Sequence, residues 1–118
     1  MAKHLMLLLS TTPYSFENTY TAFKLAEAAL EQGHKVTLFA SGDGIHNFTL
    51  NQNPKGIFNP EEKFGQLIER GMRVDLCGTC LQFRGVKGEH RVQGADPSSL
   101  KNLFALMDDS DVFVNLGF

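Results

Sequence analysis

The stretch "HLMLLLSTTPYSFENTYTAFKLAEAALEQGHKVTLFAS", residues 4–41, decides the fold because it predicts a strand, a helix and a second strand. Its first apolar run, 4–10, ends at a proline turn, as strands buried on both faces often do. A single helical face then carries Phe16, Tyr20, Phe23, Ala26 and Leu30. Ser15 is the expected N-cap, and Gly33 lies where this helix should end. The second apolar run at 35–41 completes a parallel α/β unit with short connections.

The rest of the chain continues the alternation of strands and helices. Residues 42–60 are turn-rich and lack periodicity, apart from a short helical turn within 45–50, and long stretches of this kind are often functional. The remaining elements expected are a helix from Pro60 to Gly71, a strand at 73–77, one or two helical turns at 78–83, a short strand near Arg91–Val92, a helix at 98–111 and a strand at 112–117. Pro97 fits the start of that last helix.

This pattern predicts a doubly wound α/β sandwich of the flavodoxin-like kind. We expect a mostly parallel sheet of about five strands with helices on both faces, formed by a single domain over residues 1–118. In such sheets, ligands and catalytic groups gather at the carboxyl ends of the strands. The loops after 4–10 and 35–41 and the end of 73–77 should therefore meet at one edge.

Composition excludes several classes of function. The chain has 118 residues, 42% of them apolar, and a formal net charge of −2, so we expect no direct contact with nucleic acid. No apolar run approaches the roughly 20 residues needed to span a bilayer, so no membrane association is expected. The apolar run near the N-terminus has no small-residue cleavage site after it, which favours a first strand over a signal peptide. A cytoplasmic location follows, where a close pair of cysteines indicates chemistry or metal binding more than a structural disulfide.

Both cysteines, Cys77 and Cys80, fall within "RVDLCGTCLQFRG", residues 73–85. Cys77 is the last residue of an expected strand, and Cys80 lies one helical turn further on. If residues 78–83 are helical, their free N–H groups should point at the Cys77 sulfur and lower its pKa. Arg84 and His90 add cationic or ionisable groups nearby. A thiolate formed in this way would be a good nucleophile near neutral pH.

Three other interpretations of the cysteine pair compete with a reactive thiolate. Free cysteines often behave as small buried hydrophobic residues. Structural zinc normally needs four ligands, and the chain has neither a second CxxC nor paired histidines, so we expect no metal. A redox dithiol has the right spacing. The thioredoxin pattern, however, places CxxC earlier and needs a later cis-proline, whereas Pro97 is expected to begin a helix.

The motif in "VDLCGTCLQFRGV" resembles the C-x-x-C-x-x-x-R-G signature of the DsrE/DsrF-like family, especially its small YchN-like members. The resemblance extends over nearly the whole chain, including the opening stretch and the closing "DDSDVFVNLGF". It implies that Cys77 can carry a persulfide sulfur and that the chain assembles as a homo-oligomer, a hexamer or a trimer. Cys80 belongs to the YchN-like pattern and is the candidate resolving or discharging thiol.

Further residues are candidates for lining the site. Gly78 separates the strand from the cysteine turn, and the loop Ser41-Gly42-Asp43-Gly44 should leave the same edge of the sheet. This loop is either a tight turn or a wall of the site with Asp43 or His46 facing it. Tyr14 and Phe16 either staple the first helix or form an aromatic lip over Cys77. Four phenylalanines in loops or at the chain end could cover an oligomer interface: Phe48, Phe58, Phe83 and Phe118.

These observations together predict a sulfur carrier that needs no cofactor. The Cys77 thiolate would take the outer sulfur of a persulfide donor, with Arg84 favouring the thiolate, and Cys80 or a partner thiol would remove it. Donors and acceptors would be proteins or small thiols. The alternative is a dithiol redox or oligomeric binding module without sulfur transfer.

Overall fold

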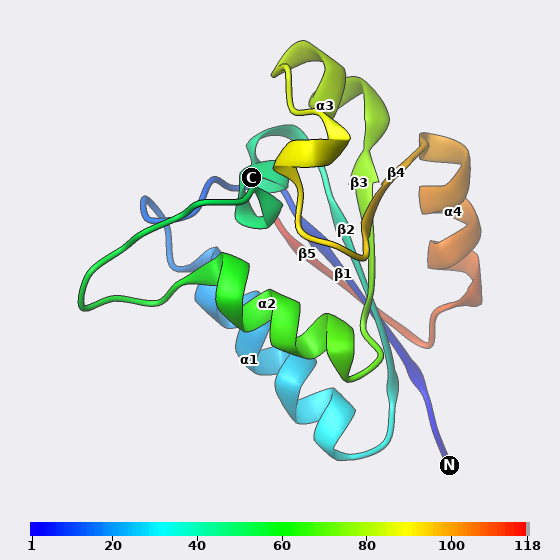
Figure 1. Ribbon diagram of the computed structural model, residues 1–118. Helices are drawn as coiled ribbons and strands as arrows, with labels where there is room; N and C mark the ends of the chain where they lie inside the picture. The colour runs from blue at the N-terminus through cyan, green and yellow to red at the C-terminus, as the bar shows by residue number, and fades with distance from the viewer. Residues whose placement is uncertain (118) are drawn as a thin grey trace.

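The computed structural model describes residues 1–117 and contains a twisted sheet between layers of helices (Figure 1). Along the chain its elements are β1 (His4–Leu9), α1 (Asn18–Glu31), β2 (Lys35–Ala40), the 3-10 helix η1 (Gly42–Phe48), α2 (Pro60–Glu69), β3 (Arg73–Cys77), α3 (Gly78–Phe83), the 3-10 helix η2 (Gly88–His90), β4 (Ala95–Ser98), α4 (Leu100–Asp109) and β5 (Val112–Leu116).

The five strands lie in the order β4-β3-β2-β1-β5, and all four pairings are parallel. The chain adds strands on one side of β1 until β4 is in place, and then crosses to the other side of β1 for β5. The expected α/β sandwich with a five-stranded parallel sheet is therefore confirmed. Because every strand points the same way, the loops after β1, β2 and β3 leave one edge of the sheet.

Alternate residues of the strands enter two apolar clusters, one on each face of the sheet. The larger cluster lies under α1 and α2, and its fully buried side chains include Leu7, Leu38 and Leu76. The smaller cluster is built on Met6 and Phe39 and includes Leu103 and Leu106 of α4. Figure 1 shows α4 on the face of the sheet opposite α1 and α2. Because α4 is the only helix on its face among the described residues, that face is less completely covered.

The first helix begins later than expected. α1 starts at Asn18 after Glu17, which makes no side-chain cap, so the assignment of Ser15 as N-cap is wrong. Residues 13–15 form a turn instead, and Tyr14 adopts a φ of 76° there, which bulky side chains rarely do. The other end agrees with the sequence, because Gly33 has a φ of 83° immediately after the last turn.

The strand expected near Arg91–Val92 lies further along the chain. Arg91 makes only an isolated antiparallel bridge to Thr49, and β4 occupies Ala95–Ser98 at the sheet edge. Pro97 belongs to this strand and does not begin the last helix, which starts at Leu100 after the N-cap Ser99. An edge strand tolerates proline because one side of its backbone has no hydrogen-bonding partner. The position of β4 bears on the candidate site, because β4 pairs with β3 directly beside Cys77.

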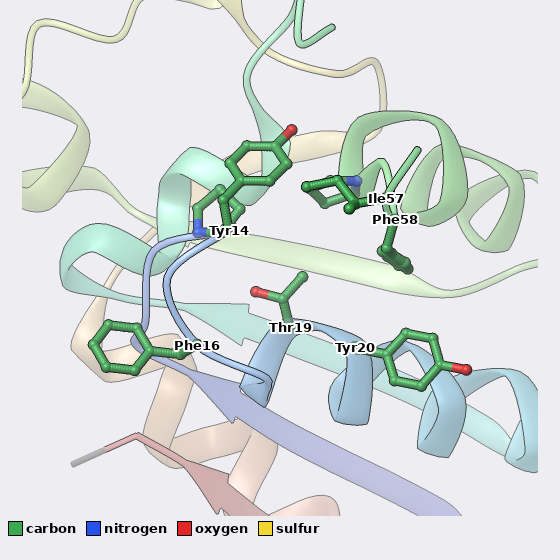
Figure 2. Close-up of a pocket in the computed structure, with 8 residues that line it drawn as sticks. Tyr14, Phe16, Thr19, Tyr20, Ile57 and Phe58 are labelled. Carbon is green, nitrogen blue, oxygen red and sulfur yellow. The ribbon is translucent and has the colours of Figure 1, made fainter. Parts of the chain in front are cut away.

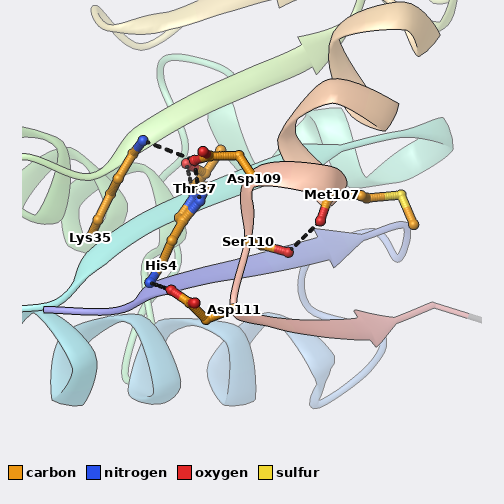
Figure 3. Close-up of polar contacts among 7 residues, drawn as sticks. All are labelled: His4, Lys35, Thr37, Met107, Asp109, Ser110 and Asp111. Carbon is orange, nitrogen blue, oxygen red and sulfur yellow. Dashed lines mark hydrogen bonds and ion pairs between the residues drawn. The ribbon is translucent and has the colours of Figure 1, made fainter.

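At the amino ends of the strands, the buried His4 forms a polar anchor (Figure 3). One ring nitrogen lies 2.8 Å from Thr37 Oγ1 on β2, and the other lies 3.0 Å from Asp109 Oδ2 at the end of α4. Lys35 also pairs with Asp109 and, together with His4, lowers the pKa of that carboxyl group. This anchor joins β1, β2 and α4 at the edge opposite Cys77. Within residues 1–117, no helix is long and apolar enough to cross a membrane.

Candidate functional site

The site begins where β3 passes directly into α3 without a loop. Cys77 is both the last residue of β3 and the N-cap of α3, and its Sγ accepts the Cys80 N–H at 3.4 Å. Gly78 follows at a point where the backbone passes close to β4, since a Cβ on it would lie 3.1 Å from the Ser98 carbonyl oxygen. The strand therefore holds Cys77 in place at the carboxyl edge of the sheet.

Cys80 lies on the first turn of α3, and its Sγ accepts the Gly42 N–H at 3.1 Å. Both cysteines are free thiols and both are half-buried. Cys77 packs against the apolar cluster under α4, whereas Cys80 packs against the larger cluster on the other face. A hollow of about 690 Å³ opens over the pair, lined by Cys77, Gly78, Thr79, Cys80, Gln82, Ser98, Ser99 and Leu100.

The pKa of the Cys77 thiol is raised, not lowered as the sequence suggested. Burial is the largest cause, and the side-chain hydrogen bond with Cys80 is the second. The backbone N–H groups of Cys80 and Thr79 act in the opposite direction but are outweighed. The expectation failed because desolvation of the sulfur and a neighbouring second thiol dominate over the few N–H groups that a helix of six residues offers.

This balance predicts how Cys77 should react with pH. A raised pKa means a smaller thiolate fraction at neutral pH, so alkylation of Cys77 in the wild type should have its midpoint above the ordinary thiol value of about 8.5. Cys80→Ser removes a thiol that raises this pKa, so the midpoint should fall. Iodoacetamide labelling across a pH series, with mass spectrometry to locate the label, measures both. A wild-type midpoint below that of a free thiol would contradict the prediction.

Arg84 and Asp43 meet beside Cys80. The Arg84 Nε donates to Asp43 Oδ1 at 2.9 Å, and its Nη1 donates to the Cys80 carbonyl oxygen at 3.3 Å. These bonds direct the guanidinium to a carboxylate and a carbonyl, and the structure gives it no hydrogen bond to either sulfur. The pair thus joins the end of α3 to η1, the loop that carries Gly42.

Three other candidates lie away from the pair. His46 is half-buried in η1 and does not line the hollow, although its carbonyl oxygen accepts bonds from Thr49 and Gln52. His90 is exposed, with Nε2 3.9 Å from a Glu89 carboxylate oxygen. Tyr14 lines a different pocket, in which its hydroxyl donates to Gln52 Oε1.

Figure 2 shows this second pocket, which aromatic side chains surround on several sides. Its lining is Pro13, Tyr14, Phe16, Thr19, Tyr20, Ile57, Phe58 and Pro60, and none of these residues belongs to the lining of the cysteine hollow. Tyr14 and Phe16 therefore form no lip over Cys77. Tyr20 and Phe58 pack edge to face at 5.5 Å between ring centroids, so this cluster adds to the packing between α1 and the chain before α2.

The sequence did not predict two parts of the site, namely Ser98 and the Gly42 N–H. Ser98 lies opposite Cys77 in the β3–β4 register, and its hydroxyl donates to the buried Asp75 at 2.7 Å. Arg73 also binds Asp75, with 2.8 Å between Arg73 Nε and Asp75 Oδ1. The polar run Asp96-Pro97-Ser98-Ser99 could have suggested an edge strand, but it resembled a helix start more closely. The Gly42 N–H has no sequence signal at all, because every residue except proline carries one.

The fold and the site place this chain among small parallel α/β sandwich proteins that carry a pair of free thiols at the carboxyl end of an inner strand. Within that class, this chain belongs to the DsrE/DsrF-like family, whose model matches residues 3–116. The match covers every strand and helix described above. The family assignment expected from the cysteine motif is thereby confirmed.

Individual relatives agree with this assignment. An uncharacterized protein of Methanopyrus kandleri is 33% identical over 105 residues, which cover 89% of this chain and 87% of that protein. The protein named "Putative sulfurtransferase DsrE" of Allochromatium vinosum is 28% identical, over 85% of this chain and 81% of its own. The crystal structure of YchN from Escherichia coli superposes with a TM-score of 0.90 at 24% identity, covering 98% of this chain and 99% of that one. The last comparison supports the fold alone.

Proposed function

We propose that this chain is a sulfur carrier in which Cys77 accepts a sulfane sulfur and Cys80 or a partner thiol removes it. The observation that carries the proposal is the arrangement of the two thiols. They lie one helical turn apart under an open hollow, and each sulfur accepts a backbone N–H, at 3.4 Å for Cys77 and 3.1 Å for Cys80. Membership of a family that includes a protein named as a sulfurtransferase supports the same chemistry.

The first step would be loading of Cys77. Its thiolate attacks the outer sulfur of a persulfide on a donor protein or small thiol, forms a new S–S bond and releases the donor as a thiolate. The Cys80 N–H at the Cys77 sulfur favours the charged form over a bare buried sulfur. The raised pKa of Cys77 lowers the fraction of thiolate that is available for loading at neutral pH.

The second step would be discharge, and it has two routes. A partner thiolate can attack the outer sulfur, which carries it away as a new persulfide and leaves the Cys77 thiolate. Alternatively, the Cys80 thiolate attacks the inner sulfur, which forms a Cys77–Cys80 disulfide and releases hydrosulfide. An external dithiol then reduces the disulfide by exchange. Both routes need reduced cysteines, which fits a cytoplasmic location.

A dithiol redox module is the second candidate. It is favoured by the position of the two thiols one helical turn apart, because adjacent thiols can form a reversible disulfide without carrying sulfur. The two functions differ in their intermediate. Only the carrier passes through a covalent persulfide, whereas the redox module alternates between dithiol and disulfide.

Intact-protein mass spectrometry after exposure to a small-molecule persulfide tests the proposal. The wild type should show a transient species heavier by the mass of one sulfur, about 32 Da, which gives way to the disulfide as sulfide appears in solution. Reduced protein that reaches the disulfide through a mixed disulfide with the small thiol, and not through the species about 32 Da heavier, would favour the redox module, since sulfide is released by either route.

We further expect a homo-oligomer, a hexamer or a trimer. Large apolar side chains are exposed near the thiol hollow, with Phe83 80%, Phe104 63% and Leu100 61% exposed. Leu100 and Phe104 lie four residues apart and so on one face of α4. Of the phenylalanines assigned to an interface from the sequence, Phe48 is buried, Phe58 packs inside the chain, and Phe118 lies outside the described residues.

Sedimentation velocity at micromolar concentration should therefore show an oligomer for the wild type. Phe104→Glu should shift it toward the monomer, because a charge buried in an apolar contact is costly. Lys101→Glu is the matched control, since Lys101 is an exposed residue of the same helix. A wild-type monomer would contradict the expected assembly without affecting the thiol chemistry.

A further inference from the structure

The Cys80 sulfur has its own hydrogen-bond donor, on a different element from the one that serves Cys77. Cys77 receives an N–H from α3, whereas Cys80 receives the N–H of Gly42, the first residue of η1. The 3.1 Å distance is short for a sulfur acceptor. An N–H donor binds a thiolate more strongly than a thiol, so this contact can hold the attacking form of the Cys80 sulfur in place.

The loop that carries Gly42 is held rigidly against β1. The buried Asn47 side chain donates to the carbonyl oxygens of Thr11 and Gly44, at 3.1 and 2.8 Å, and accepts the Thr19 hydroxyl at 2.7 Å. Gly44 packs so closely on the Leu9 carbonyl group that no side chain would fit between them. The Gly42 N–H is therefore fixed in space before any sulfur chemistry begins.

The element that carries Cys80 is less firmly attached. α3 has six residues, and only Leu81 among them is buried. The Arg84–Asp43 ion pair at 2.9 Å joins the end of this helix to the residue next to Gly42, and a second Arg84 bond holds the Cys80 carbonyl oxygen at 3.3 Å. The Arg84–Asp43 ion pair thus attaches the weakly anchored α3 to η1.

From this geometry we infer that Asp43 and Arg84 are positioning residues for Cys80, which hold its sulfur on the Gly42 N–H and so prepare it to discharge Cys77. This inference rests on the proposed function and deepens it. The step served is attack by the Cys80 thiolate on the inner sulfur of the Cys77 persulfide. One S–S bond forms between the two cysteines, the bond to the outer sulfur breaks, and hydrosulfide leaves with the electron pair.

Positioning has to be distinguished from a direct effect of charge on Cys80. The titratable and charged groups on the surrounding elements are Arg73, Asp75 and Cys77 on β3, Asp43 and His46 on η1, Arg84 after α3 and Asp96 on β4. Asp75 is engaged by Arg73 and Ser98, and the ion pair largely cancels the charges of Asp43 and Arg84. Removing Asp43 therefore separates the two roles. It frees the Arg84 charge to favour the Cys80 thiolate but breaks the attachment of α3 to the loop.

The test measures Cys80 in two independent ways. In a Cys77→Ser background, the pH midpoint of Cys80 alkylation is compared among otherwise unchanged protein, Asp43→Ala and Arg84→Ala. In chains with both cysteines, stopped-flow mixing with a small-molecule persulfide measures the rate of sulfide release. Both variants should raise the midpoint and slow sulfide release about tenfold, since a hydrogen bond to a charged group is worth roughly that factor. Arg84→Lys should recover part of the rate, because lysine can still pair with Asp43.

The outcomes are distinct. If Asp43→Ala lowers the alkylation midpoint or speeds sulfide release, Arg84 acts by its charge and the inference is wrong. If both alanine variants match the parent, the ion pair does not position Cys80. Failure of a Cys80→Ser chain to take up any sulfur would overturn the proposed function instead, and the alkylation midpoints would still decide the role of the ion pair.

Discussion

Cys80→Ser should accumulate a persulfide on Cys77 that the wild type holds only briefly. The variant loses the thiol that lies one helical turn away and would attack the inner sulfur, while the Cys80 N–H bond to Cys77 comes from the backbone and is kept. It also loses a neighbour that raises the pKa of Cys77, so loading should be faster at neutral pH. Intact-mass spectrometry should show a stable product about 32 Da heavier, with peptide fragmentation placing the extra sulfur on Cys77.

Cys77→Ser is the matched control, because it removes one thiol from the same pair by the same change. It should carry little or no sulfur after identical treatment. Equal loading of the two single variants would show that Cys77 is not the dedicated acceptor. If neither variant loads while the wild type still alternates between dithiol and disulfide, the redox module replaces the sulfur carrier.

Gly44→Ala should destabilise the fold more than alanine at any other glycine within residues 1–117. A Cβ at this position would lie 2.1 Å from the Leu9 carbonyl oxygen, and the obstructing atom is backbone at the end of β1. Relief requires β1 or η1 to move, which should lower the free energy of unfolding by about 3 kcal/mol, the upper end of the usual range for overpacking. Equilibrium denaturation in urea measures the change.

Gly65→Ala in α2 provides the comparison. A Cβ there meets nothing within 4 Å, and alanine is the better helix former, so this variant should gain about 0.5–1 kcal/mol of stability. In the surviving folded fraction of Gly44→Ala, alkylation of Cys80 should also change, because moving η1 displaces the Gly42 N–H. Similar denaturation midpoints for the two variants would contradict the close packing of η1 on β1.

Much of the fold could be predicted because local pattern and tertiary structure agree. The apolar runs that became β1, β2 and β3 are largely buried in the sheet, and the run that became β5 forms one of its edges. Asn59-Pro60 begins α2 with Asn59 as a true N-cap, accepting the Glu62 N–H at 3.3 Å. β4 was misplaced because it is short, polar and contains Pro97. Such a segment becomes a strand only through pairing with its neighbour, and its own sequence gives no periodic signal.

The site was predictable at the level of its thiols and less so in its surroundings. Cys77 could be placed because it ends an apolar strand. The direction of its pKa shift could not, because burial and the contact with Cys80 depend on packing that a sequence does not state. Arg84 was rightly placed near the pair, but its partner Asp43 lies 41 residues away along the chain, so the ion pair could not be anticipated.

The position of Pro97 has a consequence for how the sheet behaves toward other chains. The sheet has two edge strands, β4 and β5. β4 contains Pro97, which lacks an N–H, and the exposed Asp96. Both features discourage a foreign strand from joining there. The other edge strand, β5, has the sequence VFVNL, contains no proline or charged residue, and leaves Val112 51% exposed. Partly unfolded or concentrated chains should therefore aggregate by strand addition at β5 and not at β4, the edge strand beside the thiols.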